Sequence, residues 1–448
     1  LVKCDIYLIV IISTFINLLL TKKSKGIMKR IYVYIIILCL SFGFSANKKN
    51  SHYSLNNEKI NRSQNFYNSK GDSKIELLNS NIENTLLEIT VEDYELVNVS
   101  NMSNYFKINF DNGSPILKEG APDLPKMNTS IIIPDNSSMK VSVVEHDFIV
   151  IEDINIIPSK GNITRDINPN TIPYIFGYEY EINEFYPSNI VELGEPYILR
   201  DLRGQGVIIN PFQYNAITKT LRIYTKIVLK IEKDNSLNRS LKNGLSRTKS
   251  IIEQSHEFKA IYENLFINYY TDTRFNYIDD LGNMLIICYD DFLDEMTPFV
   301  DWKNRKGIPT EIVALSTIGS SSNQIQSYVS DYYYQNGLTY LLLVGDAAQM
   351  PTPIVGGSAS DPTYGFIEGN DAFSEIIVGR FSANNPSELI TQVERSLQYE
   401  QDPSAHVDHF NKALGIASSQ GPGYGGLSDD DFNDLLWDDF LSDFSYED

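Results

Sequence analysis

The sequence predicts two folds in succession, an all-β sandwich-like domain and then an α/β domain with a mainly parallel sheet and flanking helices. Over residues 86–232, short apolar runs alternate with turn residues and helical periodicity is scarce, as in β sandwiches. From residue 284 the pattern changes, and short apolar runs alternate with capped amphipathic segments. Such alternation is typical of βαβ units, whose strands run parallel.

The composition limits the possible partners. The chain has 448 residues, enough for two or three domains, and 42% of them are hydrophobic, enough for a substantial core. Acidic residues number 58 against 37 basic ones, which gives a formal net charge of −21. This charge argues against nucleic acid as a partner, because phosphate binding needs a basic surface. An acidic surface agrees with solubility and with divalent-cation binding.

A secretory signal peptide is predicted at residues 28–45. It has a basic pair, an apolar stretch over residues 31–40 and small residues before a cut between Ser45 and Ala46. A short membrane anchor is the alternative, but the apolar stretch is too short to span a bilayer comfortably. Residues 1–27 are then upstream translation. We expect membrane contact only during export, and a protein that is secreted or at the cell surface.

The rest of the chain divides into four segments by composition. Residues 46–85 are rich in Asn, Ser and Lys and are predicted to be a polar linker. Residues 86–232 carry the β-sandwich pattern, and residues 233–280 form a second linker with a helical stretch near residues 251–266. Residues 281–448 carry the α/β pattern. The strands predicted in the β segment are residues 105–110, 130–134, 140–144, 148–151, 206–210 and 221–231.

The α/β segment is predicted from apolar runs and from the signals at helix ends. Strands are predicted at residues 284–289, 310–314, 339–344 and 413–417, with another near an edge at 375–378. Capping residues place helix starts at Thr297-Pro298, Ser322, Asn385-Pro386 and Ser428. The first two of these helices are expected to end at Gly307 and Gly337.

Cys288 is the one candidate cysteine nucleophile, because Cys4 and Cys39 lie in the N-terminal apolar segments. It sits inside the apolar run 284–289, so a buried core cysteine is the favoured interpretation. With one cysteine left, no internal disulfide framework is predicted. No Gly-x-Ser-x-Gly elbow is present for a serine nucleophile. The sequence therefore assigns no catalytic residue.

A group of acidic residues follows the apolar run 339–344. Asp346 closes that run at the carboxyl edge of a predicted parallel strand, where ligands and metals collect. Asp371, Phe373 and Glu375 come next at alternate positions, so an extended segment points all three to one face. Carboxylate and carbonyl oxygens are the ligands that Ca²⁺ takes. The pattern alone also fits a solvated acidic loop, which is the more common case.

Three segments of the α/β region resemble the gingipain family of secreted cysteine peptidases, peptidase family C25. They are residues 339–346, residues 361–365 (Asp-Pro-Thr-Tyr-Gly) and residues 369–382. In the β region, the segments that resemble the propeptide of that family are residues 120–125 with 131–134, and residues 211–216 with 221–224. The resemblance implies that the α/β segment is an incomplete caspase-like catalytic domain and that the β segment is its propeptide.

The resemblance implies that the protein is the precursor of a secreted cysteine endopeptidase. The enzyme would act on protein or peptide substrates, and its own prodomain would be an intramolecular inhibitor. The family carries its base in a Gly-His-Gly segment and its nucleophile in an Ala-Cys segment, and both are expected beyond residue 448. The 448-residue chain is therefore expected to be an inactive N-terminal fragment. The activating cut is expected between Arg274 and Phe275. The histidines that lack the Gly-His-Gly context are His52, His146, His256, His406 and His409.

The resemblance also implies a structural Ca²⁺ site. Its ligands would be Asp346, Glu368, Asp371, Phe373 and Glu375, with Glu368 and Phe373 contributing main-chain oxygens. The alternative function belongs to a different class, a secreted Ca²⁺-binding surface protein without catalysis. Gly-His-Gly and Ala-Cys segments further along the reading frame would favour the peptidase.

Overall fold

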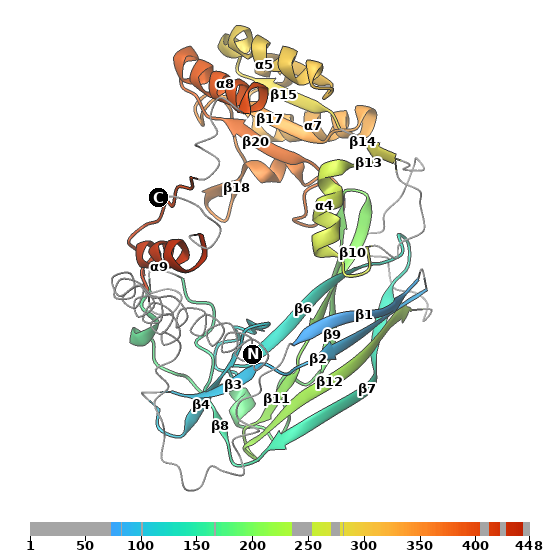
Figure 1. Cartoon of the computed structure of the whole chain (residues 1–448), viewed down its shortest axis with the longest axis vertical. Coiled ribbons are helices and arrows are strands. Elements are labelled where there is room, and N and C mark those ends of the chain that lie inside the picture. The colour runs from blue at the N-terminus through green and yellow to red at the C-terminus, as the bar shows by residue number, and fades with distance from the viewer. Residues whose placement is uncertain are drawn as a thin grey trace, which may run out of the picture. The chain divides into compact units, whose positions relative to one another are not determined.

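The computed structural model describes nine stretches of the chain, in which the β-rich part is followed by the α/β part (Figure 1). Both predicted cuts, Ser45–Ala46 and Arg274–Phe275, lie outside the described residues, as does the predicted signal peptide. None of the helices in the described part has both the length and the apolarity that crossing a bilayer requires. The described residues are 73–81, 83–99, 102–164, 167–234, 253–269, 278–280, 282–403, 412–421 and 427–441.

The β domain is built from antiparallel sheets. One sheet has the order β1-β2-β12-β11, and β7 also pairs with β12. A second sheet has the order β5-β6-β10-β9. The bounds in the first sheet are β1 Lys74–Ser80, β2 Asn84–Thr90, β7 Met139–Ile151, β11 Phe212–Asn215 and β12 Thr220–Lys233. Those in the second are β5 Ser114–Pro115, β6 Pro125–Ile132, β9 Val191–Leu199 and β10 Leu202–Ile209.

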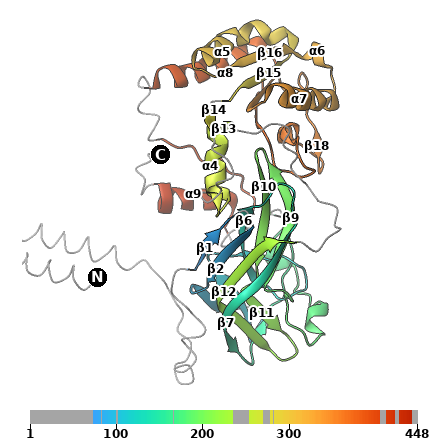
Figure 2. The same cartoon turned by 90° about the vertical axis from the view of Figure 1, so that its right-hand side faces the viewer.

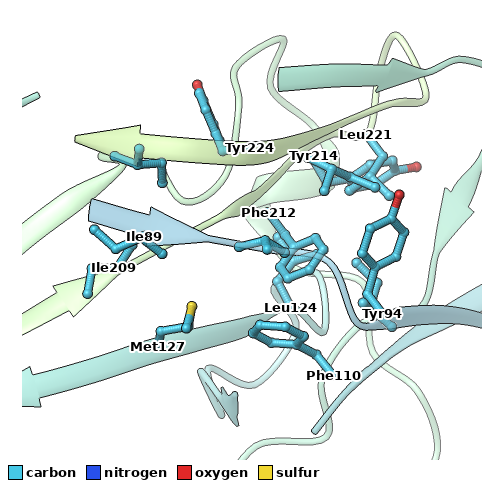
Figure 3. Close-up of a cluster of buried hydrophobic side chains, with 14 of the residues drawn as sticks. Ile89, Tyr94, Phe110, Leu124, Met127, Ile209, Phe212, Tyr214, Leu221 and Tyr224 are labelled. Carbon is cyan, nitrogen blue, oxygen red and sulfur yellow. The ribbon is translucent and has the colours of Figure 1, made fainter. Parts of the chain in front are cut away.

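A third, small sheet has the order β3-β4-β8, with β3 at Tyr94–Asn98, β4 at Tyr105–Phe110 and β8 at Asn155–Ile156. Figure 3 shows the core between the sheets, where Ile89 and Phe212 of the first sheet meet Met127 and Ile209 of the second. Each such fully buried apolar side chain contributes about 1.5–3 kcal/mol. The predicted β-sandwich class is therefore confirmed.

Two predictions for the β domain need correction. Strand β1 and the start of β2 lie inside residues 46–85, which the composition assigned to a linker. The cause is that β1 is an edge strand with only Ile75 and Leu77 packed against the core, so its apolar pattern is weak. The strands predicted at residues 140–144 and 148–151 are one continuous strand, β7.

The segment between the two domains contains helix α4 (His256–Leu265), close to the predicted helical stretch. Its buried residues Phe258 and Tyr262 pack with Tyr197 and Leu202 of the β9–β10 hairpin. Two short strands, β13 (Glu253–Ser255) and β14 (Ile278–Asp280), pair in parallel.

The α/β segment has a sheet of four parallel strands with the order β16-β15-β17-β20. One core cluster joins the sheet to α5 and α8, and another joins its opposite face to α7, so helices cover both faces (Figure 2). The α/β prediction is therefore confirmed. The strands are β15 Met284–Cys288, β16 Thr310–Ala314, β17 Tyr340–Val344 and β20 Ile377–Phe381. The helices are α5 Leu293–Arg305, α6 Leu315–Ile318, α7 Ser322–Asn336, α8 Pro386–Gln401 and α9 Asp429–Leu436.

The helix ends follow the capping signals, with one exception. Ser321, one residue before the predicted Ser322, caps α7 in a capping box with Gln324, and Gly337 ends that helix at φ +71°. Asn385 caps α8 as predicted, by accepting the Glu388 N–H. The exception is α5, which begins at Leu293 and contains Pro298. A 3₁₀ turn over Asp290–Phe292 leads directly into this helix, so it starts one turn before the proline.

The strand predicted at residues 413–417 is wrong for the described structure. This segment forms no ladder with any described strand, and Leu414 and Ile416 are 84% and 87% exposed. Apolar alternation predicts that a segment can be extended, but a strand also needs a paired neighbour.

Candidate functional site

Cys288 lies at the end of β15, between β16 and β17, and is fully buried. Its Sγ lies 3.3 Å from the main-chain oxygen of Tyr289, and burial raises the pKa of the thiol to about 12. Because the thiolate is the nucleophilic form, this cysteine is a core residue and not an attacking group.

The five residues predicted to bind Ca²⁺ do not lie together, because the direction of the strands places Asp346 away from the other four. In the parallel pair of β17 and β20, Tyr340 lies opposite Ile377 and Val344 lies opposite Phe381. Asp346 therefore follows the carboxyl end of β17, whereas Glu375 precedes the amino end of β20. The ladder from Tyr340 to Val344 covers four residue steps, so at about 3.3 Å per residue it alone puts roughly 13 Å between the two edges, and Asp346 and Glu375 each lie two residues beyond it. A single site that contains both Asp346 and Glu375 is contradicted by this register.

Asp346 belongs to a network at the carboxyl edge of the sheet. Its carboxylate accepts the Ser382 hydroxyl at 2.6 Å, and this bond is the main reason why the pKa of Asp346 is lowered. Nearby, Arg380 of β20 forms two 2.7 Å bonds to the Asp361 carboxylate and donates to the main-chain oxygen of Gly345 at 2.8 Å. These bonds tie the loop after β17 to the sheet.

The other four predicted ligands lie together in residues 367–375, which we call the acidic loop. Glu375 is fully buried, and its Oε2 accepts the N–H groups of Ile367 and Glu368 at 2.8 and 3.0 Å. Burial raises the pKa of Glu375 to about 7, and the charge of Asp371 adds to the effect. Among the described residues, no cationic side chain is among the groups that shift this carboxylate's pKa, and no group of three or more acidic, Cys or His residues forms a metal cluster.

The acidic loop contacts the β9–β10 hairpin of the β domain. Asp371 accepts the main-chain N–H of Ile198 through Oδ2 at 2.9 Å and that of Phe373 through Oδ1 at 3.0 Å. The Phe373 ring stacks on Tyr197, with centroids 3.8 Å apart and an interplanar angle of 12°. The two segments are thus joined by both polar and aromatic contacts.

Arg200, at the tip of the same hairpin, makes the most extensive polar contact with the α/β segment. Its Nη1 donates to the main-chain oxygens of Leu338 at 2.6 Å and Glu375 at 2.8 Å, and its Nη2 donates to Thr339 Oγ1 at 3.1 Å. Sequence reasoning missed this residue because β9 was not predicted. The signal available was a charged pair, Arg200-Asp201, between two apolar runs.

Comparisons with known proteins agree on one family. The C25 propeptide model matches residues 65–266, and the model of peptidase family C25 matches residues 278–445. Gingipain R2 of Porphyromonas gingivalis (strain ATCC BAA-308 / W83) is 39% identical over 320 residues, which cover 70% of this chain and 42% of the relative. Gingipain R1 of P. gingivalis is 37% identical over 318 residues, covering 70% of this chain and 31% of the relative. The chain thus spans less than half the length of these relatives.

Two solved structures are also similar. The complex of P. gingivalis RgpB pro- and mature domains matches with 35% identity and a TM-score of 0.40, over 44% of this chain and 97% of that chain. The crystal structure of the Arg specific cysteine proteinase gingipain R matches with 36% identity and a TM-score of 0.34, over 37% of this chain and 39% of that chain.

The raised pKa of Glu375 predicts that stability falls with pH in Ca²⁺-free buffer. The folded state holds the proton more tightly than the unfolded state, so this stabilisation is complete below about pH 4.5 and is lost as the pH rises through about 7. The loss is about 3 kcal/mol. Glu375→Gln, which cannot ionise, should flatten the fall in unfolding midpoint between pH 4.5 and 8, measured with chelator. Exposed Glu394→Gln is the control, and a Glu375→Gln slope equal to the parent's would refute the assignment.

Proposed function

Since the chain belongs to peptidase family C25, we propose that the protein is the precursor of a secreted cysteine endopeptidase acting on protein or peptide substrates. The observation that carries the proposal is the succession, in one chain, of a C25 propeptide at residues 65–266 and a C25 peptidase segment at residues 278–445. The fold supports it, because a β sandwich precedes a parallel α/β sheet in the same order. Secretion follows from the predicted signal peptide at residues 28–45.

The chemistry proposed is attack of a thiolate on the scissile carbonyl, with a base that takes the thiol proton and N–H donors that stabilise the oxyanion. Cys288 is unsuited to this role, because it is buried in the sheet and its pKa is raised. We therefore assign the nucleophile and base to segments other than the described ones. The carboxyl edge of the sheet, which Arg380 and Asp361 organise, is the edge where parallel α/β sheets gather ligands.

We further propose that the propeptide inhibits its own peptidase. Support comes from the contacts of the β9–β10 hairpin with the acidic loop, which include the Ile198–Asp371 hydrogen bond and the Tyr197–Phe373 stack. In P. gingivalis RgpB, which is 35% identical over the matched part, the structure is of a complex between the pro- and mature domains.

A structural Ca²⁺ remains part of the proposal, with a reduced set of ligands. Asp371 and Glu375 would give carboxylate oxygens, and Glu368 and Phe373 main-chain oxygens, which are the hard donors that Ca²⁺ prefers. The fit rests on Glu375, a fully buried carboxylate whose pKa is raised by burial and by the charge of Asp371, with no cationic side chain of the described residues offsetting it. The ion would neutralise this pair and fix the acidic loop. Asp346 is left out because it lies at the other edge of the sheet.

The 448-residue chain should show no peptidase turnover, because its one described cysteine is a core residue. The assay uses a mixed peptide library with Ca²⁺ and reductant, and compares residues 1–448 with the product of the extended reading frame. We expect turnover from the longer product only. Turnover by the 1–448 chain that Cys288→Ala abolishes would overturn the assignment. An inactive longer product would favour the non-catalytic Ca²⁺-binding protein instead.

Activation should remove the propeptide by a cut between Arg274 and Phe275. This part of the sequence is polar and lies between the two family matches, where exposed linkers are preferred sites of cleavage. N-terminal sequencing of the mature form should find Phe275 first, and Arg274→Gln should slow maturation. A mature form that still carries residues 86–231 contradicts the proposal.

Ca²⁺ should stabilise the folded chain. An ion that binds only the folded state raises the unfolding midpoint by mass action, and a free concentration of 100 times Kd adds about 2.7 kcal/mol. Thermal unfolding of the full chain is compared in Ca²⁺ and in chelator, for the parent and for Asp371→Ala. We expect Asp371→Ala to lose the response and Asp346→Ala to keep it. If the unfolding midpoint of the parent is the same in Ca²⁺ and in chelator, the proposed Ca²⁺ site is contradicted.

A further inference from the structure

At the tip of the β9–β10 hairpin, Arg200 has a backbone conformation that residues other than glycine rarely adopt. The hairpin turns through two residues, Arg200 and Asp201, since Leu199 pairs with Leu202. Arg200 has φ +49°, in the left-handed region. A side chain is strained there by contact between Cβ and the following carbonyl, whereas glycine adopts this region freely. Strain of this kind points to a function that requires the side chain.

The guanidinium of Arg200 donates its hydrogen bonds to the α/β segment. Its acceptors are the main-chain oxygen of Leu338, Oγ1 of Thr339 and the main-chain oxygen of Glu375, at 2.6–3.1 Å. All three belong to residues one or two positions before β17 or β20, so one side chain binds the amino ends of two adjacent strands. The side chain is 11% exposed.

Residues of the β domain and α4 hold the arginine in place. The guanidinium lies over the Phe258 ring of α4, 4.9 Å from its centroid. Asp201, the other turn residue, pairs with Arg200 Nε at 3.7 Å and accepts the Tyr262 hydroxyl at 3.2 Å. The Arg200 side chain is therefore held in position by Phe258 of α4 and by Asp201 of the hairpin.

A second contact lies beside the arginine. Gly204 of β10 faces Tyr197 and Phe266, and a Cβ at this position would come within 2.6 Å of the first and 2.7 Å of the second. The missing side chain lets Tyr197 lie over the strand and present its ring to Phe373. Gly369, at φ +72°, turns the acidic loop so that Asp371 receives the Ile198 N–H.

We propose that Arg200 anchors the propeptide to the amino edge of the peptidase sheet, and that this anchor keeps the two segments together after the chain between them is cut. The partner surface is formed by residues 338–339 and the acidic loop. The inference rests on the division into propeptide and peptidase segment that the proposed function uses. Since the anchor lies at the edge opposite to Asp346, it holds the propeptide without occupying the carboxyl edge.

The test is association after a cut. A recognition sequence for a site-specific protease replaces residues 271–276 in the full chain, the folded protein is cut, and the two halves are followed by size exclusion over a dilution series. The parent halves should elute together. Arg200→Gly should raise their Kd roughly a hundredfold, the loss expected for a central, buried arginine contact. Phe373→Ala should weaken association from the other side of the interface.

Arg200→Gly tests the anchor without impairing folding. It removes the guanidinium, and glycine adopts the positive φ of this position without strain. Hydrogen exchange in β12 should stay as slow as in the parent. Exposed Arg395→Ala is the matched control and should not change the Kd. Parent halves that separate, or Arg200→Gly halves that bind as tightly as the parent halves, overturn the proposal. Peptidase activity is not measured, so failure of the proposed function leaves this result unaffected.

Discussion

All four strands of the peptidase sheet run in the same direction, and this constraint decides which residues can meet. Residues that precede β17 and β20 gather at the amino edge, and those that follow these strands gather at the carboxyl edge. The amino edge holds Glu375 and the contacts of Arg200. The carboxyl edge holds Asp346 with Ser382. Two acidic groups close in sequence therefore lie at opposite edges of the sheet.

The contact at the amino edge must accommodate charge that is removed from water. Glu375 is fully buried, and an isolated carboxylate in such a place is costly. Main-chain N–H groups of Ile367 and Glu368 supply part of the compensation. The main-chain N–H of Arg200 adds a longer contact to Glu375 Oε1 at 3.5 Å, and its guanidinium donates to the main-chain oxygen of the same residue. The β domain thus completes an environment that the acidic loop builds only in part.

Local sequence signals predicted the elements well, because their causes are local. Thr310–Ala314 and Tyr105–Phe110 have the predicted bounds, and Asn385 and Ser428 cap their helices as side-chain chemistry requires. The site was predicted less well because it depends on strand direction and on contacts distant in sequence. The acidic pattern and the family resemblance place Asp346 and Glu375 in one Ca²⁺ site, and neither takes account of strand direction. Arg200 carries no motif, and its role emerges only when residues 198–200 and 338–375 are brought together.

In the arrangement we propose, the propeptide is held at the amino edge of the sheet and the carboxyl edge is organised independently. Hydrogen exchange on the full chain measures both edges at once. In Arg200→Gly, amides at residues 367–375 should exchange faster than in the parent, together with those at residues 197–199. Amides at residues 345–350, held through Arg380, should keep the parent's rates. Equal acceleration at both edges, or no change at the acidic loop, would contradict the account.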